Sequence, residues 1–427
     1  MLKKHPRGLI VLFFTAMWER FGFYTMMALF VLYMNDSFGW SDQVKGIHYG
    51  VFNGAVYIFP ILGGWVADKL LGYKKTIILG AIVMGFGYAF LAMSSLEKLF
   101  MFYLALVVIA VGNGFFKANI SVLLGRLYKK GSDLKDVGYN IFYMGINIGA
   151  LIAPFASAYL RHTFSFQTAF AAAAVGMVLS LIIFEVGKRS YIEANNIDTS
   201  KKGGKDRMKD VEDIPKSESR ERIIALAILL AIAFFFWMAF YQNASAMTLF
   251  AKRSVKHYKL LTPEVYQSFN PLFILLLTPL IVGLFNHLRK KNKEPSTPAK
   301  ICIGMFVAAL AMVVMFAASI MGGNKDMNIM SPSWLIITYL IMTVSELLIS
   351  PMGLSYTSKV APPKLQGAMM GFWFGATGMG AIAAGIFAGF YSSMPHHIFF
   401  IIIAACLALA GLMVLGVMNK LKKFGND

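Results

Sequence analysis

Four residues that carry charge at neutral pH lie deep within long apolar stretches of this sequence: Glu19, Arg20, Lys117 and Glu346. A charge at the centre of a bilayer costs about 2.5–3.5 kcal/mol even on a lenient insertion scale, so each must face protein or water. Their formal charges sum to zero, which fits a mutually compensating cluster. Ion pairs that only hold helices together are the alternative, but buried pairs stabilise poorly compared with apolar packing. We therefore interpret the four residues as a site for a polar solute or a proton.

Uncharged polar side chains in the apolar stretches add to this site. At 3.6 residues per turn, Arg20 and Tyr24 share one helical face with Ala16 and Met27, which we interpret as a cavity wall. A single membrane Asn or Tyr more often links helices than binds a ligand, so only the set as a whole indicates a polar cavity. The uncharged candidates are Tyr24, Tyr57, Tyr143, Asn147, Gln242, Asn270 and Ser350.

The stretches that carry these residues have the length and composition of membrane helices. The chain has 427 residues, is 58% hydrophobic and only 14% charged, and its mean hydropathy is +0.64. About twenty apolar residues cross a bilayer, and such a span must be helical to satisfy its own backbone. We therefore predict an all-α polytopic membrane protein. Its twelve spans are predicted over residues 8–34, 47–67, 75–94, 99–121, 138–160, 166–187, 222–251, 266–287, 299–322, 333–358, 366–390 and 397–419.

The basic residues predict the orientation of these spans. If both termini are cytoplasmic, 30 of the 40 Lys and Arg residues fall in cytoplasmic segments and 8 on the opposite side. Lys and Arg accumulate on the cytoplasmic side of membrane proteins, so this orientation is the expected one, in the inner (plasma) membrane. The same loops account for the net charge of +19 and predict contact with an anionic inner leaflet.

A polar segment divides the spans into two sets of six. Residues 188–221 are charged and almost free of large apolar side chains, which is typical of a linker. The predicted organisation is a six-helix bundle over 1–187, this cytoplasmic linker, and a six-helix bundle over 222–427. Two such halves are the architecture of a major facilitator transporter, which holds its substrate between them near the midplane. A twelve-span channel or receptor fits the same pattern.

Several other classes of protein are disfavoured by what the sequence contains. The basic residues lie between spans and not in an aromatic-interleaved patch, so no nucleic-acid partner is expected. We find no phosphate loop, nucleophile constellation or metal-spaced His/Cys set, and we expect neither an enzyme nor a metal or cofactor. His396 and His397 are adjacent, and neighbours on a helix do not face one metal.

The motifs resemble those of the proton-dependent oligopeptide transporter family of the major facilitator superfamily, over nearly the whole chain. "WERFGFY" is similar to the end of the first-helix ExxERF signature of that family, and "GGWVADKLLGYKK" to the superfamily loop between helices two and three. Helices four, five, eight, ten and eleven are matched by "NGFFKANIS", "FYMGINIGAL", "FNPLF", "ELLISPMGLS" and "GAMMGFWFG". The resemblance implies proton-driven symport of di- and tripeptides.

The resemblance also implies roles for single residues. The family lines its peptide pocket with residues that fall at Lys117, Tyr143, Asn147, Asn270 and Glu346, with Tyr24 and Tyr57 alongside and Trp373 closing one part. Glu346 with the two asparagines can hold a peptide ammonium, while Arg20 and Lys117 can hold its carboxylate. Lys117 and Glu346 can also pair across the two halves when the site is empty.

Three positions depart from the family pattern. The first glutamate of the ExxER motif would fall at Ala16, a second arginine for the peptide carboxylate at Met27, and an acidic residue on helix seven at Tyr241. Losing the last two together avoids one unpaired charge in a dry cavity. Many bacterial relatives also carry two extra helices between the halves, for which the linker here is too short and too polar.

We therefore expect a monomeric secondary transporter that imports di- and tripeptides or peptide-like solutes by alternating access. Protons are the expected driving ion, carried by Glu19 or Glu346, because rocking that removes the neighbouring cation would favour protonation of the carboxylate. One alternative is a divergent transporter of another amphiphilic metabolite, such as an amino-acid conjugate or peptide-like siderophore, with or without proton coupling. Another is a membrane nutrient sensor that binds its ligand without transporting it.

Overall fold

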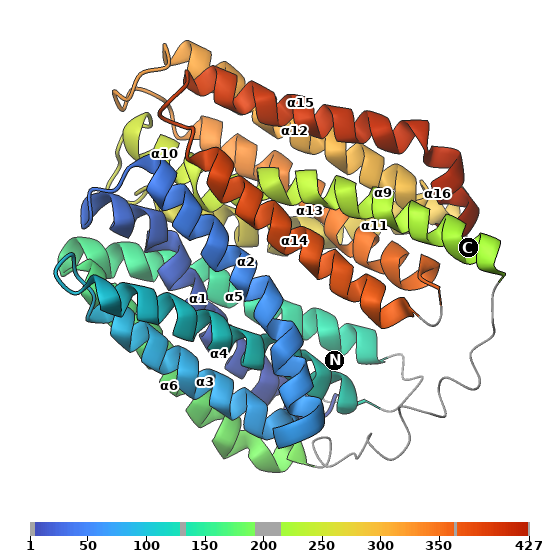
Figure 1. The fold of residues 1–427 in the computed structure, drawn as a ribbon, viewed down its shortest axis with the longest axis horizontal. Coiled ribbons are helices and arrows are strands. Elements are labelled where there is room, and N and C mark those ends of the chain that lie inside the picture. The colour runs from blue at the N-terminus through green and yellow to red at the C-terminus, as the bar shows by residue number, and fades with distance from the viewer. Residues whose placement is uncertain (1–4, 129–133, 193–214, 363–364, 426–427) are drawn as a thin grey trace. The chain divides into compact units, whose positions relative to one another are not determined.

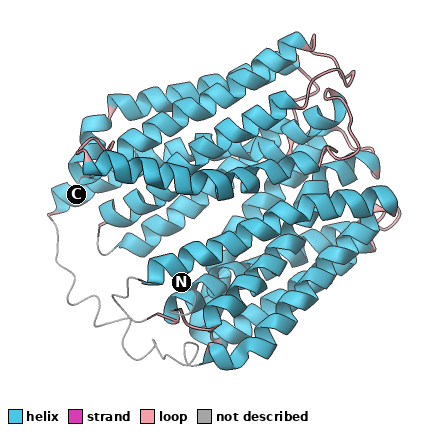
Figure 2. Ribbon diagram, turned by 180° about the vertical axis from the view of Figure 1, so that it is seen from behind, coloured by secondary structure: helices cyan, strands magenta, loops and turns pink. Residues whose placement is uncertain are grey.

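The computed structural model describes residues 5–128, 134–192, 215–362 and 365–425. Helices joined by loops make up these ranges, and Figure 2 shows no strand in them. The β-type contacts between described residues are two isolated bridges, Val255 with Met330 and Tyr258 with Leu261. The predicted all-α fold is confirmed.

Eleven helices in the described ranges are long and apolar enough to cross a membrane. They correspond to eleven of the twelve predicted spans. The remaining one, predicted over residues 8–34, is the 29-residue helix α1 (Gly8–Asp36), which is roughly 44 Å long at 1.5 Å per residue. Its length suffices to span the membrane, but Glu19 and Arg20 lower its apolar character.

The contacts within the chain define two compact units. The first unit comprises Met1–Trp40 and Ala55–Gly203, and the second comprises Ser41–Gly54 and Gly204–Asp427. Helix α2 (Asp42–Val66) therefore begins in the second unit and ends in the first. The boundaries expected from the sequence stay a prediction, and residues 193–214 of the predicted linker lie outside the described residues.

In the first unit, α1 packs along α5 and α6, while α3 packs along α4 and α6 (Figure 1). Glycines permit the close approach of α5 to α1, because a Cβ at Gly145 would meet the Phe13 ring and one at Gly149 the Met17 carbonyl. The remaining elements of this unit are η2 (Ala67–Leu71), α3 (Tyr73–Ala92), α4 (Leu99–Arg126), α5 (Leu134–Thr163), α6 (Phe166–Val186) and η3 (Gly187–Ser190).

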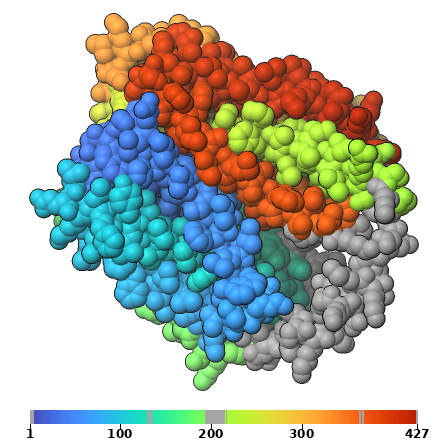
Figure 3. Space-filling view, in the orientation of Figure 1, coloured from blue at the N-terminus to red at the C-terminus, as the bar shows by residue number. Residues whose placement is uncertain are grey.

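In the second unit, α12 packs against α13 and α15, and α9 packs against α14. Figure 3 shows the side chains of α9 and α14 next to each other on one face. The elements of this unit after α2 are α9 (Lys216–Phe240), η4 (Tyr241–Ala244), α10 (Ala246–Arg253), η5 (Val265–Ser268), α11 (Phe269–Lys290), α12 (Thr297–Met321), α13 (Ser333–Val360), α14 (Gln366–Ala388), α15 (His396–Gly416) and α16 (Met418–Gly425).

The span predicted as one helix over 222–251 is interrupted at η4, between α9 and α10. Side chains satisfy the backbone carbonyls around this break: Tyr49 donates to the Tyr241 carbonyl over 3.1 Å, and Tyr339 donates to the Asn243 carbonyl over 2.9 Å. A broken helix is tolerated inside a membrane where protein groups replace the lost backbone partners. Neither glycine nor proline occurs at the break, so the sequence did not predict it.

A charged cluster closes the loop between α11 and α12. Arg289 Nε donates to Glu294 Oε2 over 2.6 Å, and Lys300 Nζ lies 2.6 Å from Glu294 Oε1. These hydrogen bonds, that from Arg289 first, lower the pKa of the Glu294 carboxyl from 4.5 to about 2. The loop is therefore held by a carboxylate that stays ionised through most of the acidic range.

We expect the Glu294 cluster to contribute about 1 kcal/mol to stability, because the side chain of Arg289 is 69% exposed and solvent screens the pair. Since the folded-state pKa is depressed, this contribution is fully present above about pH 4.5 and is lost as the pH falls towards 2. Unfolding of purified Glu294→Gln and unsubstituted protein at several pH values measures it. A stability difference that did not shrink between pH 4.5 and 2 would contradict this assignment.

Candidate functional site

The centre of α1 carries a buried ion pair between adjacent residues. Arg20 Nε donates to Glu19 Oε2 and Arg20 Nη2 donates to Glu19 Oε1, both over 2.5 Å. Glu19 is 1% exposed and Arg20 5%. The guanidinium also lies 4.9 Å from the centroid of the Phe23 ring. A fork-to-fork pair of this kind keeps both charges satisfied until something competes for one of them.

Lys117 of α4 is the second cation of the first unit's site. Its ammonium lies 4.6 Å from the centroid of the Tyr57 ring on α2, a cation–π contact that is stronger where water is excluded. Lys117 also interacts electrostatically with Glu19 and Arg20. Tyr24 interacts in the same way with Arg20. The structure therefore brings together Glu19, Arg20, Tyr24, Tyr57 and Lys117.

The candidates on α5 lie one turn apart. Asn147 is 4% exposed, and its Nδ2 donates to the Tyr143 carbonyl over 2.9 Å. Tyr143 is 45% exposed. These two residues alternate with Gly145 and Gly149, which pack on α1, so the polar face of α5 is turned away from that contact.

In the second unit, Asn270 of α11 and Glu346 of α13 are in direct contact. Asn270 Nδ2 donates to Glu346 Oε2 over 2.8 Å and to Thr343 Oγ1 over 3.0 Å. Thr343 in turn donates to the Tyr339 carbonyl over 2.7 Å. A carboxylate held by one amide keeps further lone pairs, which an ammonium or a proton can use.

Three other predicted residues of the second unit have different surroundings. The ring of Trp373 on α14 packs against Gly353 of α13, where an added Cβ would collide with it. Ser350 lies one turn after Glu346 on the same helix. Gln242 is 0% exposed and donates to the carbonyls of Met238 and Ala384, so it fastens the helix break to α14. A part for Gln242 in binding stays a prediction.

The three positions that depart from the family pattern lie in α1 and η4. Ala16 and Met27 are buried in α1, with exposures of 2% and 4%. Tyr241 begins η4, and its ring lies 5.7 Å from that of Trp237. Each unit thus has its own polar cluster, and a shared cavity with Lys117 pairing to Glu346 stays a prediction.

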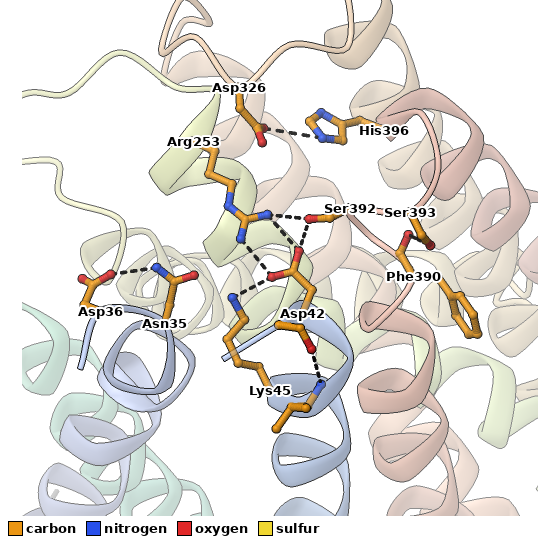
Figure 4. A network of polar contacts seen from close by, with 12 residues as sticks. Asn35, Asp36, Asp42, Lys45, Arg253, Asp326, Phe390, Ser392, Ser393 and His396 are labelled. Carbon is orange, nitrogen blue, oxygen red and sulfur yellow. Dashed lines mark hydrogen bonds and ion pairs between the residues drawn. The ribbon is translucent and has the colours of Figure 1, made fainter. Parts of the chain in front are cut away.

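Sequence reasoning missed Thr343, which orients Asn270, and a polar network around the buried residues Asp42 and Lys45 in the second unit. In that network, Asp42 at the start of α2 accepts from Arg253 of α10 over 2.8 and 2.9 Å and from Lys45 over 2.6 Å (Figure 4). Ser392 also donates to Asp42. None of these residues lies inside a long apolar stretch, where a charge would stand out in the sequence. Only the fold therefore reveals that they are close together.

We expect Asp42→Asn to destabilise the protein by about 3 kcal/mol, because Lys45 is 2% exposed and would lose its counter-charge. The lower end of the usual range applies, since the side chain of Arg253 is 21% exposed and can reach water. Thermal unfolding of the purified protein measures this. Glu221→Gln is the control, because its partner Lys423 is exposed and such pairs contribute about 0–1 kcal/mol. Equal effects of the two substitutions would refute the assignment.

Among the described residues no group of His, Cys, Asp and Glu could hold a metal ion. The two clusters are instead suited to recognising groups of opposite charge. The cations of the first unit can bind an anionic group, and the carboxylate of the second unit can bind a cationic one.

The chain is similar to known proteins along most of its length. A model of the POT family matches residues 74–203 and 194–405. The peptide transporter YePEPT of Yersinia enterocolitica is 32% identical over 90% of this chain and 88% of its own length. Dipeptide and tripeptide permease A of Proteus mirabilis is 31% identical over 90% and 86%. The crystal structure of a peptide transporter POT in complex with sulfate superimposes with a TM-score of 0.89 at 26% identity, covering 99% of this chain and 96% of that one.

Proposed function

The chain belongs to the POT family, and from this premise we propose that it imports di- and tripeptides or peptide-like solutes by alternating access coupled to protons. The observation that carries the proposal is that each unit has a polar cluster of its own, cationic in the first unit and anionic in the second. Arg20 and Lys117 in the first unit suit the carboxylate of a peptide, and Glu346 in the second suits its ammonium. A zwitterionic peptide needs both.

Binding then competes with interactions that already exist. A peptide carboxylate can replace Glu19 on the guanidinium of Arg20, with which it can form the same two parallel hydrogen bonds. A peptide ammonium can donate to the free oxygen of Glu346, whose other oxygen Asn270 holds. The substrate thereby finds a partner for each of its charges, while Glu19 loses the cation that it had.

Proton coupling follows from the same competition. A carboxylate that loses its cation to the substrate is left as an uncompensated charge in a poorly hydrated site, and taking up a proton removes that cost. Glu19 is in this position when Arg20 turns to a peptide, and Glu346 when the peptide's ammonium leaves. One proton bound and later released by either group balances the step, with no other species consumed.

The orientation and surroundings belong to the proposal as well. With both termini cytoplasmic, the loops that hold most Lys and Arg residues face an anionic inner leaflet. The pair of clusters is complete within one chain, so we propose that a monomer transports.

Uptake of a labelled dipeptide library into proteoliposomes, with and without an inward proton gradient, tests the proposed function. Peptide symport predicts saturable uptake that diverse dipeptides compete for and that the gradient increases. Saturable uptake without any effect of the gradient would indicate a peptide uniporter. Absence of uptake and of competition would overturn the assignment of peptides as substrate.

Met27 and Tyr241 motivate a second candidate substrate class, which the similarity to peptide transporters does not favour. They stand where the resembled family has charges, so the carboxylate side of the pocket is less cationic and more apolar. An amino-acid conjugate or another amphiphilic metabolite would suit such a pocket. Competition for its uptake by plain dipeptides would exclude this candidate.

A further inference from the structure

Three polar side chains that the proposed mechanism does not use are fully buried in the first unit. They are Thr25 of α1, Tyr88 of α3 and Asn113 of α4, with exposures of 0% each. Within the described ranges, the hydroxyls of Thr25 and Tyr88 and both polar atoms of the Asn113 amide have no hydrogen-bond partner. Buried polar groups nearly always find a partner, in protein or in ordered water.

Other buried polar residues of the same unit are paired. Tyr33 donates to the Ser94 carbonyl over 2.8 Å, Ser180 to the Thr15 carbonyl over 2.8 Å, and Asn119 to the Gly63 carbonyl over 3.0 Å. The packing of this unit is therefore able to satisfy such groups. The three exceptions call for a partner that is not a protein group.

The Tyr88 ring and Thr25 lie along α1, within two helical turns of the Glu19–Arg20 pair. The Tyr88 ring lies beside Gly22, one turn after Glu19, because a Cβ there would be 3.4 Å from Tyr88 Cε2. Tyr88 also interacts electrostatically with both members of the pair. Thr25 is one turn beyond Gly22 on the same face of α1.

Asn113 belongs to α4, the helix that also carries Lys117. It lies one helical turn before Lys117, on the same face, and Lys117 interacts electrostatically with Glu19 and Arg20. A side-chain amide offers two donors and an acceptor, and a tyrosine hydroxyl can donate and accept at once. Together they can hold a water molecule through three or four hydrogen bonds, which is the usual coordination of a buried water.

We propose that Thr25, Tyr88 and Asn113 line an internal water site inside the first unit, and that this water carries protons to and from Glu19. This proposal rests on the proposed proton coupling. A hydronium ion gives its proton through the bound water to Glu19 Oε, leaving neutral water and a neutral carboxyl group. Arg20 stays protonated and is free for the peptide carboxylate. The reverse step returns the proton, and no electrons are transferred.

The site also lies on the side from which an importer would take up protons. Thr25 is between Glu19 and the end of α1 at Asp36, and Tyr88 is one turn from the end of α3 at Ala92. In the proposed topology both helix ends are on the external side. Tyr88 and Asn113 are thus positioning residues for the proton carrier and need no contact with the peptide.

Two substitutions test the proposal in the full-length protein in proteoliposomes. Tyr88→Phe removes the hydroxyl and keeps the ring, and Asn113→Leu replaces the amide by an apolar group of similar size. We expect each to slow uptake driven by a proton gradient at least tenfold, while peptide counterflow at equal pH stays within twofold. Tyr33→Phe is the matched control, because the Tyr33 hydroxyl is equally buried but is hydrogen-bonded to protein. This substitution should not lower gradient-driven uptake relative to counterflow.

A high-resolution structure of the protein supplies a readout independent of transport. Ordered water within hydrogen-bond distance of Tyr88 Oη and the Asn113 amide is expected, and Tyr88→Phe should displace it. A dry site overturns the proposal, as do full gradient-driven uptake in both variants or an equal loss of driven uptake and counterflow. If a proton gradient does not increase uptake by the unsubstituted protein, the proposed proton coupling and the proposed proton transfer through water are both wrong. The water density still shows whether the site is hydrated.

Discussion

Substituting Glu346 by Gln should abolish the ability of a proton gradient to concentrate peptide inside proteoliposomes. Glutamine keeps an oxygen that can accept the 2.8 Å hydrogen bond from Asn270, so the substitution removes the titratable charge and little else. A gradient of one pH unit supplies about 1.36 kcal/mol per proton, enough for roughly tenfold accumulation. We expect that ratio to fall to about one, while counterflow of peptide at equal pH continues.

Glu185→Gln is the control for the loss of a membrane-helix carboxyl. Glu185 pairs with Lys74 over 3.1 Å at the end of α6, and its side chain is 37% exposed. This variant should keep gradient-driven accumulation. Should Glu346→Gln accumulate peptide as fully as the unsubstituted protein, Glu346 takes no part in the coupling and Glu19 alone carries the proton.

Replacing Arg20 by Lys should weaken the binding of peptides that have a free C-terminal carboxylate. Lysine retains the charge but cannot form the two parallel hydrogen bonds that Arg20 now makes to Glu19. One hydrogen bond to a charged group contributes about 1.5–3 kcal/mol, which corresponds to roughly a 10- to 100-fold increase in KM. Concentration dependence of uptake for a dipeptide and for its C-terminal amide measures the effect.

The comparison with the amide separates recognition from general damage. The amide lacks the carboxylate, so its uptake should be weak in the unsubstituted protein and change little in Arg20→Lys. Arg161→Lys, which alters a pair with Asp36 at the C-terminal end of α1, should leave both KM values unchanged. Parallel loss of uptake for both peptides in Arg20→Lys would show that Arg20 holds the fold and not the substrate.

Composition and periodicity determined the class of fold and the positions of nearly every membrane helix. A bilayer offers no hydrogen bonds, so a run of about twenty apolar residues has one stable structure, the helix. The charged residues that flank the run mark where the helix ends. For the same reason the sequence pointed to Glu19, Arg20, Lys117 and Glu346. A charge in an apolar run is costly wherever the run packs, so it is conspicuous before any packing is known.

Only the tertiary structure decided which polar groups meet. Asn270 and Glu346 are 76 residues apart in the chain, and whether they touch depends on the packing of α11 against α13. The break after α9 depends likewise on the hydroxyls of Tyr49 and Tyr339, which come from helices distant in the sequence. No glycine or proline at the break predicts it. That Tyr88 and Asn113 find no hydrogen-bond partner among the described residues is a property of the packed unit as a whole. Hydrophobicity acts on each segment by itself, whereas hydrogen-bond satisfaction is decided between segments, and that is why the sequence determined the helices and the structure determined the chemistry inside them.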